Sequence, residues 1–196
     1  MTHIDNVAHI LTNGITHRNS PDANPNFVTI GDSSLISTRD SYKLENGKLL
    51  GDYVPFYFGT RTPMLFVIQK GFNGLKAIPA QEIVYCVTSV QKIINTGLDF
   101  VFTNGHAVDT FTSQFSNEDI YSLVDSIDWE AVSINDWRRE NDLDLKRRKQ
   151  AEFLVLGDIP KEAILGFITF NQGAKKTVIN FGASDSNVYV KSGYYF

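Results

Sequence analysis

The chain has 196 residues, of which 42% are hydrophobic and 20% are charged, and this composition excludes an intrinsically disordered protein. The length is sufficient for a full hydrophobic core, and the lack of any break in composition predicts a single domain over residues 1–196. The formal net charge of −4 excludes a protein that binds nucleic acid through an overall basic surface, so any such contact must come from a local patch.

The first half of the chain predicts short helices and strands separated by two long polar loops. Asp5 or Asn6 can cap a helix whose apolar residues follow helical spacing up to Gly14, which would end it. Residues 16–26 and 31–51 carry loop-forming side chains, and loops of this length are more often functional than idle. The other elements predicted here are strands at 53–58, 64–69 and 83–88, a helix at 89–94 and a strand at 100–102.

The second half predicts one clear helix and several strands. Residues 116–119 carry a helix-opening pattern, and apolar residues after them fall on one helical face. Residues 129–144 are mixed, helical and acidic. Strands are predicted at 151–156, 164–170, 177–181 and 188–196. Strands of uneven spacing with few helices predict an α+β fold with mainly antiparallel pairing.

Glu152 is the most informative residue, because it interrupts an otherwise apolar run that is typical of a buried strand. Burying an unpaired carboxylate costs several kcal/mol, so such a residue is kept either because a partner satisfies it or because chemistry uses it. The densest positive charge in the sequence, at 146–149, comes directly before it. A basic run of this kind usually forms a solvated face. Its position directly before Glu152 favours a site where a polyanionic substrate binds next to the catalytic carboxylate.

Two further residues are candidates for a site, each with a simpler interpretation beside it. Arg61 lies in a predicted turn between two apolar strands, where a guanidinium can grip a carboxylate or phosphate, or can be an ordinary surface arginine. His106 follows a strand and an Asn-Gly turn signal, and a solvated turn histidine fits that position equally well.

Metal, disulfide and membrane functions find no support in the sequence. The four histidines do not pair at ligand spacing, so we expect no metal. Cys86 is the single cysteine; it excludes an internal disulfide, suits the cytoplasm and is expected to be a buried thiol. No apolar run approaches the ~20 residues that span a bilayer, so we expect no membrane partner.

Several segments resemble, in the same order, the DarT family of DNA ADP-ribosyltransferase toxins, and the resemblance spans nearly the whole chain. The most specific are VPFYF with the following R-T-P-M-L, and KRRKQAEFLV around Glu152; the weaker ones are T-H-I-D-N at the start and N-G-H-A around His106. Relatives carry further residues before the first of these segments, including another polar NAD contact, whereas here Met1 stands directly before Thr2.

The resemblance implies an ADP-ribosyltransferase fold, with two small, mainly antiparallel β-sheets and flanking helices around an NAD cleft. It implies that NAD is the co-substrate, without a metal, and that ADP-ribose passes to a thymine or guanine of single-stranded DNA, which blocks replication. It also implies a cognate antitoxin that removes the mark, a hydrolase of the macrodomain type or similar. We expect a cytoplasmic monomer.

The resemblance also assigns roles to individual residues. The catalytic residues would be Glu152, Arg61 and His106. The loop before about Tyr53 would cover the cofactor, and residues 106–150 would choose the acceptor. Matching positions place NAD contacts at Thr2, His3, Asp5, Asn6 and Arg61, and DNA contacts at Lys146, Arg147, Arg148 and Lys149.

Two alternatives remain open at this stage. The same fold can ADP-ribosylate RNA or protein instead of DNA. The chain can also be a nucleic-acid-binding module that has lost its chemistry, although the presence of Glu152, Arg61 and His106 together argues against that.

Overall fold

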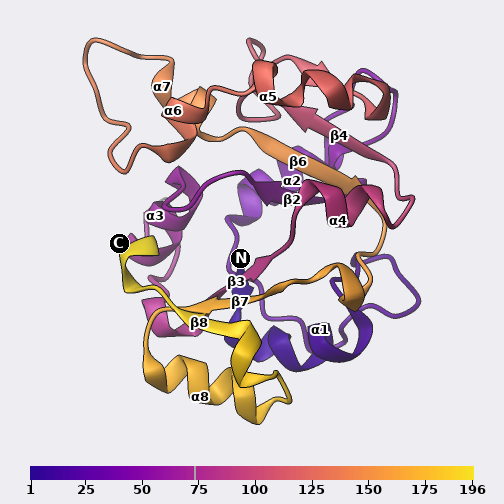
Figure 1. Ribbon diagram of the computed structural model, residues 1–196. Coiled ribbons are helices and arrows are strands. Elements are labelled where there is room, and N and C mark those ends of the chain that lie inside the picture. The colour runs from indigo at the N-terminus through magenta and orange to yellow at the C-terminus, as the bar shows by residue number, and fades with distance from the viewer. Residues whose placement is uncertain (73) are drawn as a thin grey trace. The chain divides into compact units, whose positions relative to one another are not determined.

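The chain folds into two compact units, each built around its own four-stranded sheet (Figure 1). The computed structural model describes residues 1–72 and 74–196. Unit 1 contains residues 1–32, 64–98 and 157–196, and unit 2 contains residues 33–63 and 99–156. Neither unit is a continuous stretch of sequence, because the chain passes between them repeatedly. The expected α+β fold with two mainly antiparallel sheets is confirmed.

The sheet of unit 1 is antiparallel except at one edge. Its strands are, in spatial order, β1 (Thr2–His3), β3 (Ile83–Val87), β7 (Gly166–Thr169) and β8 (Val188–Val190). The β7–β8 pair is parallel, and helix α8 (Gln172–Asn180) connects these two strands. A parallel pair requires such a crossover, so this helix follows from the pairing.

The two faces of this sheet pack against different helices. Successive residues of a strand point to opposite faces, and Ile83 and Val84 accordingly join separate core clusters. Val84 packs with α1 (Val7–Asn13) and α8, while Ile83 packs with α3 (Pro63–Lys70) and the C-terminal Tyr195. Helix α4 (Val90–Ile94) follows β3.

The sheet of unit 2 is antiparallel throughout, and its two central strands are buried. Its spatial order is β2 (Tyr53–Tyr57), β6 (Glu152–Leu156), β4 (Phe100–Thr103) and β5 (Gln114–Phe115). Pro55 lies in the edge strand β2, where the missing N–H of proline is tolerated. The helices of this unit are α2 (Ser33–Ser41), α5 (Leu123–Ser126), α6 (Trp129–Ser133) and α7 (Leu145–Lys149).

Alternation along β6 directs successive side chains into different surroundings on the two faces of the sheet. Phe153 stacks on Phe100 with ring centroids 4.7 Å apart. Leu154, on the opposite face, packs in a buried cluster with Val101 and Ala107. Glu152 is two residues before Leu154, so the strand period directs its side chain to this second face.

Most of the predicted elements are confirmed. Helix α1 ends at Gly14, which adopts a positive φ, and Ser89 caps α4 by accepting a hydrogen bond from the Lys92 N–H at 3.2 Å. The opening pattern at 116–119 is a capping box, but the helix begins as a 3-10 turn (Asn117–Ser122) before α5. The strands expected near 53, 83, 100, 152 and 164 are β2, β3, β4, β6 and β7.

Three predictions were wrong, and two of these errors have a local cause. Residues 64–69 form helix α3 instead of a strand, because Pro63 occupies the first helical position, where its missing N–H costs nothing. Residues 177–181 belong mainly to α8, whose N-cap Asn171 accepts a hydrogen bond from the Ala174 N–H at 2.9 Å. The expected loop at 31–51 contains α2. The last predicted strand is shorter than expected, since β8 ends at Val190.

Candidate active site

Glu152 is fully buried in unit 2, and each of its carboxylate oxygens has a hydrogen-bond donor. The Arg39 Nη1 lies 2.9 Å from Oε2, and the backbone N–H of Ala107 lies 3.1 Å from Oε1. The Glu152 N–H donates to Thr103 Oγ1 at 3.1 Å, and that hydroxyl donates to the Gly105 carbonyl at 2.7 Å. These contacts fix the carboxylate in one geometry and offset the cost of burying it.

Arg39 was missed by the sequence analysis, which treated its segment as a loop. Helix α2 brings it to β6 by packing on the 3-10 turn Leu50–Asp52. Gly51 makes this approach possible, since a Cβ there would lie 2.9 Å from the Cα of Asp40. The Arg39 side chain is 18% exposed, and its Nη2 is buried with no hydrogen-bond partner among the described residues. The guanidinium therefore has donor capacity left for a ligand oxygen.

His106 lies on the loop that also supplies the Ala107 N–H. Its own N–H donates to the Arg147 carbonyl at 3.1 Å, which ties this loop to α7. Burial lowers the pKa of the imidazole, while the Glu152 carboxylate acts in the opposite direction. The lowered pKa favours the neutral imidazole, and the histidine lies within electrostatic reach of Glu152 and Arg39.

Tyr57 is a second residue that the sequence analysis missed. It pairs with Glu152 in the β2–β6 register, so its ring is on the same face of the sheet. Burial, and then the neighbouring carboxylate, raise the pKa of the phenol well above its ordinary value. The phenol of Tyr57 therefore stays protonated near neutral pH. It can donate a hydrogen bond beside Glu152 but cannot act as a base there.

Arg61 follows β2 and precedes α3, and not a second strand as expected. Its φ of 50° is the one positive value among the described non-glycine residues. The neighbouring Lys149 is 2% exposed, and its Nζ donates to the carbonyls of Val132 at 3.0 Å and Thr60 at 3.4 Å. Burial, and then the charge of Arg61, lower the pKa of Lys149 to about 8.

The basic run at 146–149 forms α7, and most of its charge is used within unit 2. Arg148 contacts three carboxylates and Arg147 one of the same three; those acids are Asp128, Asp142 and Asp144. Lys149 is buried, whereas Lys146 is exposed. The run is thus neither a simple solvated face nor four free cations, and Lys146 is its one member with an exposed side chain in the described structure.

Four of the five residues predicted to contact NAD lie in unit 1, on β1 and the 3-10 turn Ile4–Asn6, whereas the fifth, Arg61, lies in unit 2. Asn6 is 1% exposed, and its amide donates to Thr2 Oγ1 and to the Val28 carbonyl, both at 2.8 Å. Its oxygen accepts from the Val28 N–H at 2.8 Å. His3 lies 3.5 Å from Glu82 through Nε2 and accepts from the Asp5 N–H at 3.2 Å. Asn6 therefore joins β1 to the backbone of Val28.

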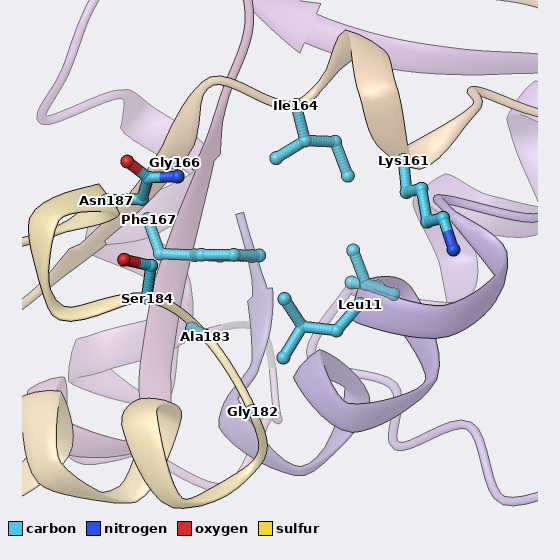
Figure 2. Close-up of a pocket in the computed structure, with 10 residues that line it drawn as sticks. Leu11, Lys161, Ile164, Gly166, Phe167, Gly182, Ala183, Ser184 and Asn187 are labelled. Carbon is cyan, nitrogen blue, oxygen red and sulfur yellow. The ribbon is translucent and has the colours of Figure 1, made fainter.

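Unit 1 also contains a small open pocket that is separate from all the predicted site residues. It lies between α1, β7 and the 182–187 segment, with Leu11, Ile164 and Phe167 projecting toward it (Figure 2). Its volume is about 190 Å³. No cluster of three or more metal-ligating side chains occurs among the residues that the structure describes, and no helix in residues 1–72 or 74–196 is long and apolar enough to cross a membrane.

The whole chain is similar in sequence to a family of enzymes that modify DNA. A sequence model of the family described as "ssDNA thymidine ADP-ribosyltransferase, DarT" matches residues 1–196. A protein of Escherichia coli O127:H6 named DNA ADP-ribosyl transferase is 32% identical over 202 residues, which cover 100% of this chain and 91% of that protein.

Solved structures give the same result at the level of the fold. The structure of Thermus sp. 2.9 DarT in complex with ADP-ribosylated single-stranded DNA matches with a TM-score of 0.85 at 30% identity, and covers 100% of this chain and 93% of that one. The same protein in complex with NAD+ matches with a TM-score of 0.80.

A Thermosipho africanus fusion of a DNA ADP-ribosyl transferase with a DNA ADP-ribosyl glycohydrolase is similar in sequence. It is 29% identical over 159 residues, which cover 79% of this chain and 37% of the fusion.

Proposed function

Since the chain belongs to the DarT family of single-stranded DNA ADP-ribosyltransferases, we propose that it modifies thymine and that Glu152 is its catalytic carboxylate. The chain is an NAD-dependent DNA ADP-ribosyltransferase with NAD as co-substrate, and a toxin role fits the family. The observation that carries the assignment of Glu152 is a fully buried carboxylate whose two oxygens are held by Arg39 and the Ala107 N–H.

The reaction breaks the bond between nicotinamide and the ribose carbon, and forms a bond from that carbon to a base nitrogen. Positive charge develops on the ribose as nicotinamide leaves with the bonding electrons. A carboxylate that is already fixed in place stabilises this charge without rearranging. Glu152 then accepts the proton that the base nitrogen loses, and passes it to water. The fixed geometry of Glu152 in β6 supports both roles.

The side chains around Glu152 support the handling of the other reacting groups. Arg39 has one buried nitrogen with spare donor capacity, which suits a phosphate or a base carbonyl oxygen. The lowered pKa of His106 favours the neutral imidazole, which suits a hydrogen bond to the acceptor base. We assign to Arg61 the support of NAD and of the reacting base, as the sequence resemblance implies. Its left-handed backbone is held beside Lys149.

The cofactor segment of unit 1 has a different task. We propose that Thr2, His3 and Asp5 contact NAD. Asn6 would instead hold the backbone of this segment in place through its hydrogen bonds to Val28. Its side chain is buried and already occupied, so an indirect role suits it better than a direct contact. We propose that residues 1–196 act as one catalytic domain.

We further propose a cytoplasmic monomer that works with an antitoxin able to remove the ADP-ribose. The fused glycohydrolase of the Thermosipho africanus relative supports this kind of partner. Among the predicted DNA contacts, the exposed Lys146 suits a phosphate best, since Arg147 and Arg148 already pair with carboxylates and Lys149 is buried.

Incubation of the protein with NAD and short oligonucleotides, followed by mass spectrometry, tests the proposal. We expect a mass shift on single-stranded DNA that fragmentation places on thymine, and none on matched RNA or protein acceptors. Glu152→Gln should lower transfer by ~10²–10⁴-fold. Glu130→Gln, at an exposed position of α6, is the matched control and should leave transfer unchanged. Near-normal transfer by Glu152→Gln rejects the assignment, and labelling of guanine rejects the choice of base.

A further inference from the structure

The loop at 104–113, between β4 and β5, displays an aromatic side chain to solvent. Phe111 is 82% exposed, although it lies only five residues from His106. Single exposed apolar residues are common on protein surfaces and carry no meaning by themselves. The setting of Phe111 is what distinguishes it, because the same short loop carries His106 and the Ala107 N–H that holds Glu152.

The backbone that carries Phe111 is fixed by hydrogen bonds within the loop. The Phe111 N–H donates to Asp109 Oδ1 at 3.0 Å, and the Thr112 N–H donates to the Asp109 carbonyl at 3.0 Å. At the base of the loop, the Ser113 N–H donates to Asn104 Oδ1 at 2.9 Å. An exposed ring on such a backbone loses little conformational entropy when a ligand stacks on it.

The loop is also fastened to α7. Arg147 Nη1 donates to Thr112 Oγ1 at 3.2 Å and to Asn104 Oδ1 at 3.4 Å. Gly105 packs so closely that a Cβ there would lie 2.4 Å from the Arg147 Nη1. The next residue along the chain before Arg147 is the exposed Lys146. A cation and an aromatic ring are thus presented from two elements that are joined to each other.

We propose that Phe111 is a stacking platform for a base that neighbours the modified base in single-stranded DNA, with Lys146 placed for a backbone phosphate. This inference rests on the proposed function and deepens it, because it names a residue that selects an unpaired strand. Proteins that bind single-stranded nucleic acid combine aromatic stacking with cations along the backbone. In a duplex the neighbouring base is stacked on its own strand, so the platform favours an unpaired substrate.

The test measures DNA binding separately from transfer. Fluorescence anisotropy without NAD reports the affinity for a labelled oligonucleotide that has one thymine, and for versions with an abasic site at each flanking position in turn. We expect Phe111→Ala to weaken binding roughly tenfold, within the range of stacking on one base. One abasic position should weaken the unmodified protein to a similar degree, and should have no further effect on Phe111→Ala.

Further variants separate stacking from general apolar contact. Phe111→Tyr keeps a ring and should bind as the unmodified protein does, whereas Phe111→Leu should resemble Phe111→Ala. Tyr189→Ala removes an exposed aromatic ring from β8 and should leave binding unchanged. Because Phe111 is mostly exposed, these changes should not unfold the chain.

Three results of these measurements would contradict the stacking role of Phe111. Unchanged DNA binding by Phe111→Ala, equal binding by the leucine and tyrosine variants, or abasic effects that persist in Phe111→Ala would overturn it. Unchanged DNA binding by Phe111→Ala would indicate that the exposed Phe111 ring contacts a protein partner instead of DNA. A lack of transfer by the unmodified protein would instead reject the proposed function, whatever the binding measurements give.

Discussion

At the predicted site residues, the two units bury different kinds of polar side chain. Unit 1 buries the amide of Asn6 beneath the predicted cofactor segment, where it bonds to backbone and hydroxyl groups. Unit 2 buries charges, namely Glu152 with its partner Arg39 and the ammonium of Lys149. Neutral hydrogen bonds shape a binding segment at low cost, whereas buried charges are expensive and are held in advance for chemistry. On the roles proposed above, Asn6 supports binding of NAD from unit 1, and the buried charges of unit 2 support the reaction.

Among the tests of this comparison, the largest effect is expected from Arg39→Gln, because it leaves Glu152 buried without its cation. Transfer should fall ~10²–10³-fold, the range seen when one preorganised donor is removed. The free energy of unfolding should fall by about 3 kcal/mol. Steady-state kinetics and denaturant unfolding measure these two quantities. Arg138→Gln, at an exposed ion pair in the same unit, is the control and should change neither. A normal rate in Arg39→Gln would remove the reason to treat the charges of unit 2 as catalytic.

Lys149 should make the stability of the protein rise with pH. Its pKa is about 8 in the folded state against 10.5 when unfolded, so between these values the unfolded chain binds more protons. The contribution of Lys149 to the free energy of unfolding should therefore increase between pH 8 and pH 10.5, by about 3 kcal/mol, and should be constant outside that window. Lys149→Met should abolish this increase, while Lys146→Met should keep it. Parallel pH profiles for the protein and Lys149→Met would contradict the buried ammonium.

A smaller effect, of a different kind, is expected in unit 1. Asn6→Ala removes the bonds that hold Val28, so the KM for NAD should rise about tenfold, corresponding to one or two lost buried hydrogen bonds. The kcat at saturating NAD should change little, because Glu152 is untouched. Asn13→Ala, at the exposed end of α1, is the matched control. A fall in kcat with an unchanged KM would show that the proposed division between the units is wrong.

The smallest effects should come from two helix caps, one in each unit. Ser89→Ala removes the cap of α4 and should cost about 1 kcal/mol of stability without altering transfer. Asp128 caps α6 through the Ala131 N–H at 2.9 Å and also pairs with Arg148, so Asp128→Ala should cost more. Thermal or denaturant unfolding compares them. Equal costs would mean that the Arg148 pair contributes nothing measurable.

The sequence was most reliable where a local signal acts over a few residues. The helix that Gly14 ends, the cap at Ser89 and the strand that begins at Glu152 were all predicted, because capping and strand patterning depend on near neighbours. Residues 64–69 show the limit of this approach. A short apolar run fits a strand or a buried helix, and only the preceding Pro63 favoured the helix that forms.

The partners of the site residues were out of reach for a different reason. Helix α2 has no buried residue and no clear apolar face, so nothing in its own composition indicates a helix or a role for Arg39. The Arg39–Glu152 pair joins residues 113 positions apart. The pairing of Tyr57 with Glu152 depends equally on the register of β2 against β6.

The sequence by itself determined that Glu152 would be buried, because a strand with apolar neighbours on both faces has no exposed side. It also determined the family, through motifs that span the chain. Only the tertiary structure decided which groups hold that carboxylate, and that Arg147 and Arg148 pair with neighbouring acids while Lys149 is buried. The physical reason is that burial follows from local pattern, whereas ion pairs and hydrogen bonds between distant residues exist only once the chain has folded.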